Sequence, residues 1–176
     1  MPRRRGLRQQ LLAAVVRSMA TLAFRPMSRL VSIVEPSGAI YRMLLVFAAR
    51  KQSLFSLVWR DQLDFLEPAY AIDQALTSEC VSSVSTDAWP GTRLMGHKAT
   101  VNFYKLSPSA TELLTGPGRL FAWRAPQLPE DLAFYVAPDR PWFGSIAHEG
   151  DAFLYADAID VAEVFANVPG LELATG

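Results

Sequence analysis

The chain has 176 residues, about the length of one domain, and its 17 basic and 17 acidic side chains leave no net charge while both histidines are neutral. Hydrophobic residues make up 51% of it, which excludes global disorder because disordered chains combine low hydrophobicity with high net charge. The single cysteine excludes an intramolecular disulfide framework and a multi-cysteine zinc site.

The N-terminal segment is positively charged, and the rest of the chain carries an equal negative charge. Residues 1–34 contain seven Arg and no acidic residue, and residues 35–176 contain ten basic and seventeen acidic residues. Within residues 8–24, apolar side chains recur at helical spacing: Leu12, Val15, Val16, Met19, Leu22 and Ala23. We therefore predict a basic amphipathic helical extension over residues 1–38, followed by a single domain over residues 39–176.

Several interpretations of this extension stay open. It has the composition of an organellar transit peptide, and residues 8–24 also suit a helix lying on a membrane surface. A secretory signal is a weaker match. The simplest interpretation is a loosely attached extension, or an over-predicted start with Met19, Met27 or Met43 as the real one. No membrane-spanning helix is expected, because arginines interrupt every long apolar window. The predicted location is cytoplasmic, or an organelle matrix if residues 1–34 are a transit peptide.

The middle of the chain alternates helical and extended patterns. The apolar run 39–49 favours a buried helix, and residues 53–60 favour a strand because they are rich in Phe, Val, Leu and Trp. Pro68 opens a helix that extends to about residue 78. Residues 80–98 are predicted to be a polar loop, residues 99–106 a half-buried strand, and Ser107 the cap of a helix that ends at residues 116–118.

The C-terminal third predicts a β-hairpin, with strands over residues 132–137 and 142–147 and a turn at residues 138–141. A further strand is expected at 152–155, and a closing helix at 158–166 with Asp157 as its cap. Four hairpin side chains are expected in the core: Phe134, Val136, Phe143 and Ile146. The fold class is therefore α+β, with an antiparallel sheet of three to five strands and helices mainly on one face.

The sharpest cluster of reactive side chains is His148, Glu149 and Asp151, at the end of the second hairpin strand. These residue types suit general acid–base catalysis, and His97 would add a second imidazole if the fold brought it near. The spacing lacks the second His of a zinc-protease helix, so a turn supported by His148 is the alternative. No metal and no cofactor is predicted.

Aromatic residues near prolines provide a different kind of candidate. Trp89 and Trp123 stand in predicted loops, and Arg124 follows Trp123; Trp and Arg are enriched where proteins bind each other. These rings could instead close the ends of a small core. With residues 127–131 they would form an acidic and aromatic face for a basic protein partner.

No nucleotide-binding or serine-hydrolase motif occurs, and the net acidic chain beyond residue 34 argues against nucleic acid as a partner. The sequence therefore favours a small non-enzymatic protein-interaction or regulatory module. The alternative is a hydrolase-type or metal-dependent enzyme that uses His148, Glu149 and Asp151. A second alternative is a peripheral membrane protein held by residues 8–24.

Overall fold

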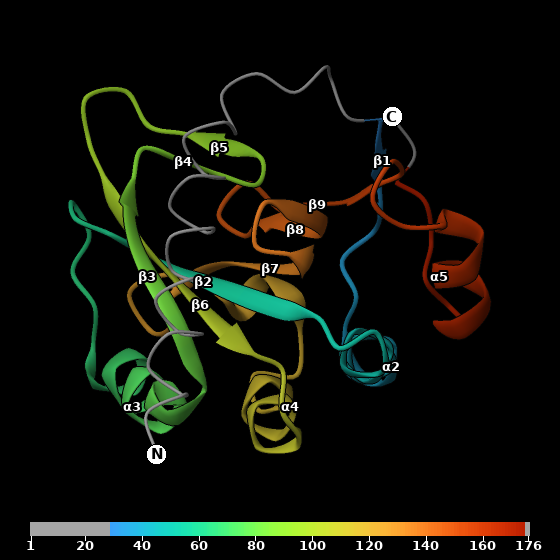
Figure 1. Ribbon diagram of the computed structural model, residues 1–176, viewed down its shortest axis with the longest axis horizontal. Coiled ribbons are helices and arrows are strands. Elements are labelled where there is room, and N and C mark those ends of the chain that lie inside the picture. Colours follow the sequence, from blue (N-terminus) through green and yellow to red (C-terminus); the bar gives the residue numbers. More distant parts are fainter. Residues whose placement is uncertain (1–28, 175–176) are drawn as a thin grey trace, which may run out of the picture.

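The computed structural model describes residues 29–174, and within this range it contains four α-helices and two antiparallel sheets (Figure 1). The large sheet has seven strands, in spatial order β1 (Leu30–Ser32), β9 (Asp151–Tyr155), β8 (Arg140–Ile146), β7 (Glu130–Ala137), β2 (Leu54–Arg60), β6 (Ala99–Lys105) and β3 (Cys80–Thr86). The small sheet is the hairpin of β4 (Ala88–Trp89) and β5 (Thr92–Arg93). The helices are α2 (Gly38–Arg50), α3 (Glu67–Leu76), α4 (Pro108–Thr115) and α5 (Val161–Asn167), with short 3-10 turns η2 (Thr77–Glu79) and η3 (Leu120–Ala122).

The two faces of the large sheet carry different layers. All four helices contribute to one core cluster with the side chains of one sheet face, including Phe55, Leu57 and Phe134. The opposite face presents Val58, Val101 and other alternate residues of the same strands, against which Trp89 of the small hairpin packs. This alternation is the period-two pattern of a sheet that has apolar side chains on both faces.

The α+β class and the antiparallel sheet are confirmed, and so are the hairpin and the elements around residues 39–49, 53–60 and 99–106. The sheet is larger than predicted, with seven strands in place of three to five. One reason is that residues 80–86 form edge strand β3 rather than a loop. Its serines and threonine resemble a loop in composition, but β6 pairs with their backbone along the strand.

The predicted closing helix begins later than expected, because Asp160 and not Asp157 caps α5: its carboxylate accepts a 2.9 Å hydrogen bond from the amide of Ala162. Of the four hairpin residues expected in the core, Phe134, Phe143 and Ile146 are buried. Val136 is 42% exposed, because it lies near the end of β7 where the pairing with β8 shifts register.

The sheet begins at Leu30, within the segment that the sequence assigned to the N-terminal extension. Residues 172–174 pair with the outer edge of this segment through hydrogen bonds to Ser32 and Val34. The basic helix predicted for residues 8–24 lies outside the described residues. Among helices within residues 29–174, none is long and apolar enough to cross a membrane.

Candidate functional site

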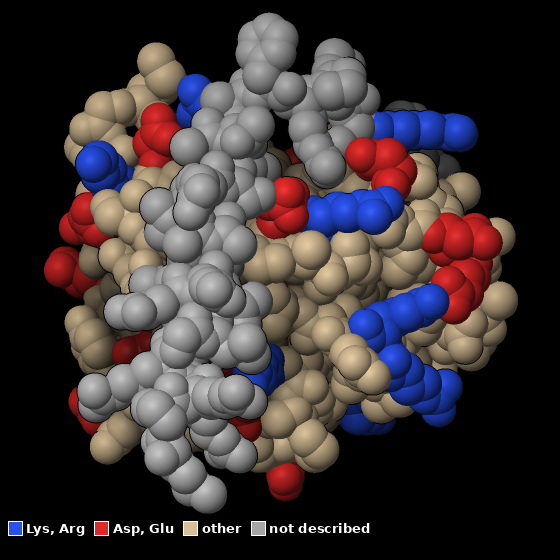
Figure 2. Space-filling model, in the orientation of Figure 1, with Lys and Arg blue, Asp and Glu red and all other residues tan. Residues whose placement is uncertain are grey.

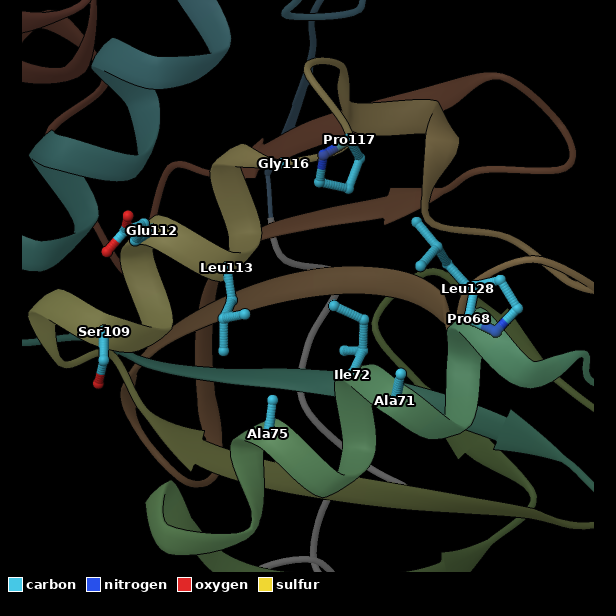
Figure 3. A pocket seen from close by; sticks show the side chains of 10 residues that line it. All are labelled: Pro68, Ala71, Ile72, Ala75, Ser109, Glu112, Leu113, Gly116, Pro117 and Leu128. Carbon is cyan, nitrogen blue, oxygen red and sulfur yellow. The ribbon is translucent and has the colours of Figure 1, made fainter.

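A groove of about 860 Å³ separates α3 from α4 on the helical side of the sheet. Leu113 points from α4, and Ile72 from α3, into the space between the two helices (Figure 3). The other α3 side chains that line the groove are small. They are Ala71 and Ala75, which lie one helical turn apart on the same side of the helix and are both exposed. The remaining lining residues are Pro68, Ser109, Glu112, Gly116, Pro117 and Leu128.

The local sequence accounts for both helices that form the groove. Pro68 and Pro108 each stand in the first turn of a helix, where a missing amide hydrogen costs nothing. The hydroxyl of Ser107 caps α4 by accepting a hydrogen bond from the amide of Ala110 at 3.2 Å. The helices therefore begin where the sequence predicts.

Carboxylates fix α3 to the sheet and to the start of α4. Asp73 of α3 accepts hydrogen bonds from Tyr104 at 3.0 Å and from Asn102 at 3.3 Å, both on β6. Glu79, just after α3, accepts a 2.7 Å hydrogen bond from Ser107 at the start of α4. These bonds hold the two walls at a fixed separation, so the groove is formed before anything binds.

The groove has an acidic border and an apolar interior. Neither α3 nor α4 contains a Lys or Arg. The exposed Glu67 lies in the first turn of α3, and the exposed Glu112 of α4 lines the groove. Along the lower left margin of Figure 2, where α3 lies, the visible charged side chains are acidic. A ligand that suits this groove presents apolar side chains toward its floor and positive charge at its border.

An aromatic cluster covers the other side of α3, and the sequence analysis did not identify it. The ring of Trp59 lies 4.6 Å from that of Phe65 and 5.6 Å from that of Tyr70, between ring centroids. Tyr70 is 53% exposed and Leu66 is 46% exposed, so the start of α3 presents apolar surface to solvent. The signal available in the sequence was the spacing of Trp59, Phe65 and Tyr70 around the start of the predicted helix.

The predicted catalytic residues are partly brought together. His148 and Glu149 line a smaller pocket of about 340 Å³ with Arg119 and Arg124, and the Nε2 atom of His148 lies 3.6 Å from the Oε1 atom of Glu149. Both side chains are exposed, at 40% and 56%. Asp151 is not among the lining residues: it starts β9 and pairs with Ile146 across the turn.

Glu130 and Asp131 are buried behind this turn, so the acidic face predicted over residues 127–131 is wrong for both carboxylates. Asp131 accepts a 2.8 Å hydrogen bond from the indole of Trp89 and a 2.9 Å bond from the amide of Ala147, next to His148. Burial raises the pKa of Asp131 to about 6, although both hydrogen bonds and the nearby His148 oppose this shift. Asp131 thus ties the small hairpin to the turn of the predicted catalytic cluster.

The predicted interaction residues separate in the structure. Trp123 is fully buried and donates a 2.7 Å hydrogen bond to the hydroxyl of Tyr41, which in turn donates to the carbonyl of Leu114 in α4. Trp89 is 7% exposed, so both indole rings belong to the interior, as the core interpretation of these residues describes. Arg124 is exposed and lines the pocket of His148.

The side chains of His97 and Cys80 are not among those that line the pocket of His148. His97 lies in the loop before β6. Partial burial and the charge of Asp73 raise the pKa of the Cys80 thiol, which disfavours the thiolate. Within residues 29–174, no three His, Cys, Asp or Glu side chains gather closely enough to hold a metal ion.

Comparisons of this chain with protein-family models, with curated proteins and with solved structures found no match.

Proposed function

We propose that this protein is a small non-enzymatic interaction module that binds an amphipathic, basic helix of a protein partner in the groove between α3 and α4. The observation that carries this proposal is the combination of a preformed apolar groove with two wall helices that contain no Lys or Arg. Helix-in-groove binding requires an apolar trough of this kind, into which side chains at one helical face insert.

The small residues of α3 make room for a helical ligand. Ala71 and Ala75 are exposed and follow one another by one turn, so a partner helix can approach this wall closely. Ile72 and Leu113 are half-buried and offer apolar contact at the floor. Burying such surface contributes about 25 cal/mol for each Å² removed from water.

Charge favours a basic partner over an acidic or neutral one. Basic and acidic side chains balance over the whole chain, but α3 and α4 contain no Lys or Arg, so the local charge at the groove is acidic. Glu112 lines the groove and Glu67 stands in the first turn of α3, so both carboxylates are available to a basic segment of the ligand. Complementary charge of this kind raises association rates and selects partners, with a dependence on salt.

The direct test uses two synthetic helical peptides with the same apolar face, one flanked by Lys and Arg and the other by Glu. Fluorescence anisotropy should show saturable binding of the basic peptide, weakened by added salt, and no binding of the acidic one. Equal binding of both peptides, or of neither, would contradict the proposal.

A further inference from the structure

The two edges of the large sheet differ in how the rest of the chain covers them. Edge strand β1, at the right of Figure 1, is three residues long. Residues 172–174 lie along its outer side, where their backbone bonds to Ser32 and Val34. Edge strand β3, at the left, is seven residues long, and among the described residues no strand pairs with its outer side. Such an edge presents a row of backbone donors and acceptors that can pair with another strand.

The register of the sheet shows which backbone groups of β3 point outward. The amide of Asp61 donates to the carbonyl of Lys98, so the even-numbered residues of β6 bond to β2. The odd-numbered residues of β6 then bond to β3, where they pair with Val84 and its alternate neighbours. The N–H and C=O groups of Ser83 and Ser85 therefore point away from β6, and both residues are exposed.

The composition of β3 leaves this edge open to pairing. Edge strands are commonly protected by Lys, by Pro or by bulges that twist the edge away. The sequence of β3 is CVSSVST, which contains no charged residue and no proline. Its register shift lies at the start, between Cys80 and Ser82, and the residues from Ser82 to Thr86 pair regularly with β6. The outer side of β3 is therefore regular enough to pair with an extended segment.

Acidic residues at both ends of β3 select the occupant of the edge. Glu79 directly precedes the strand, and Asp87 directly follows it. If two copies paired all seven residues of β3 antiparallel, Ser83 would lie at the centre and Glu79 of each copy would stand opposite Asp87 of the other. Like charges directly opposite each other destabilise such a pair. A segment with Lys or Arg at both ends meets opposite charge instead, whichever way it runs.

We propose that the outer edge of β3 binds an extended segment of a protein partner, with small or β-branched residues in its middle and Lys or Arg at both ends. The outward groups of Ser83 and Ser85 form the hydrogen bonds of the new ladder, and Glu79 and Asp87 pair with the basic residues. Glu79 is held in place, because it accepts a 2.7 Å hydrogen bond from Ser107. Strand addition of this kind draws affinity from main-chain bonds and specificity from side chains.

Synthetic peptides test strand addition directly. The probe is a capped peptide of alternating Thr and Val with a Lys at each end, and fluorescence anisotropy should show saturable binding. Two controls carry N-methyl groups on alternate amides: the version methylated toward β3 should bind at least about tenfold more weakly, and the other version nearly as well as the parent. A peptide with Glu at both ends should bind far more weakly. Equal affinities of the two methylated versions, equal affinities of the Lys and Glu peptides, or no binding of the probe would each overturn the proposal.

Variants of the edge give a second readout on the full chain. Ser83→Pro removes an outward N–H without removing a bond to β6, and edge strands accept proline at such a position. It should weaken binding of the Lys peptide about tenfold, whereas Ser83→Thr, which keeps the N–H, should leave binding nearly unchanged. Asp87→Lys leaves the strand itself intact and should weaken the Lys peptide while strengthening the Glu peptide. Equal affinity of the Pro and Thr variants, or no response to Asp87→Lys, would contradict the site.

Analytical ultracentrifugation of the protein alone tests the identity of the occupant. A dimer of the wild type that Ser83→Pro abolishes would assign the edge to a second copy and overturn the basic partner. The inference does not depend on the α3–α4 groove, because the probe is extended and not helical. Its failure therefore leaves the proposed function standing, and the reverse also holds.

Discussion

The indole of Trp89 donates a 2.8 Å hydrogen bond to the carboxylate of Asp131, and this bond ties the small hairpin to the large sheet. The other carboxylate oxygen of Asp131 accepts from the amide of Ala147, which precedes the predicted catalytic His148. One buried acid therefore positions Trp89 and the turn of His148, although the sequence placed this acid in a surface face over residues 127–131.

This acid predicts a pH dependence of stability. Burial raises the pKa of Asp131 from an ordinary value of 3.8 to about 6, so between these pH values the folded protein binds more protons than the unfolded chain. The contribution of Asp131 is largest below pH 4 and is lost as the pH rises through about 6, by up to about 3 kcal/mol. Urea denaturation of wild type and Asp131→Asn at several pH values isolates the effect, and a pH-independent difference between the two proteins would refute it.

The donor in this contact is tested by Trp89→Phe. The change keeps an aromatic ring but leaves the buried carboxylate without one of its hydrogen bonds, at an expected cost of about 1–3 kcal/mol. Trp59→Phe is the matched control, because the Nε1 atom of Trp59 has no hydrogen-bond partner among the described residues. Urea denaturation should show a clearly larger loss for Trp89→Phe; similar losses would mean that the bond to Asp131 contributes little.

The core on the helical side predicts a large effect at Phe134. Its ring is fully buried and lies 5.6 Å from that of Trp142 and 5.5 Å from that of Phe143. Phe134→Ala should therefore cost about 3–5 kcal/mol of unfolding free energy. Val136→Ala, two residues along the same strand but 42% exposed, should cost far less. Comparable losses in the two variants would contradict the difference in burial between the two positions.

His148 distinguishes the binding module from the alternative of an enzyme. Its imidazole is 40% exposed, and its Nε2 atom lies 3.6 Å from the carboxylate of Glu149. As a turn residue, His148→Gln should cost about 1 kcal/mol or less and leave peptide binding intact. Stoichiometric zinc in the purified wild type, lost in His148→Gln, is the outcome that would favour a metal-dependent enzyme; elemental analysis of both proteins measures it.

The elements that the sequence predicts correctly are those whose local signals agree. Pro68, Ser107 and the apolar spacing of residues 39–49 each fix a helix through contacts only a few residues apart. The hairpin of β7 and β8 is equally local, because a short turn joins two apolar strands. Such patterns need no knowledge of the tertiary fold.

The features that the sequence does not reveal depend on partners far along the chain. Edge strand β3 forms because β6 pairs with it, although its serines favour a loop. Trp123 stands in an irregular segment yet is buried, because Tyr41, 82 residues away, accepts its hydrogen bond. The α3–α4 groove likewise exists only once Asp73 and Glu79 have joined the two helices to the sheet and to each other.

The most direct test of the proposed function blocks the groove from inside. Ala75→Arg would place a cation on the α3 wall, where it fills space and repels a basic ligand, while Gln74→Arg adds the same charge to an exposed neighbouring position that does not line the groove. Titration of the basic helical peptide, followed by fluorescence anisotropy, should show affinity reduced at least about tenfold by Ala75→Arg, equivalent to about 1.4 kcal/mol, and nearly unchanged by Gln74→Arg. Equal affinity for the wild type and Ala75→Arg would contradict the assignment of the groove as the binding site.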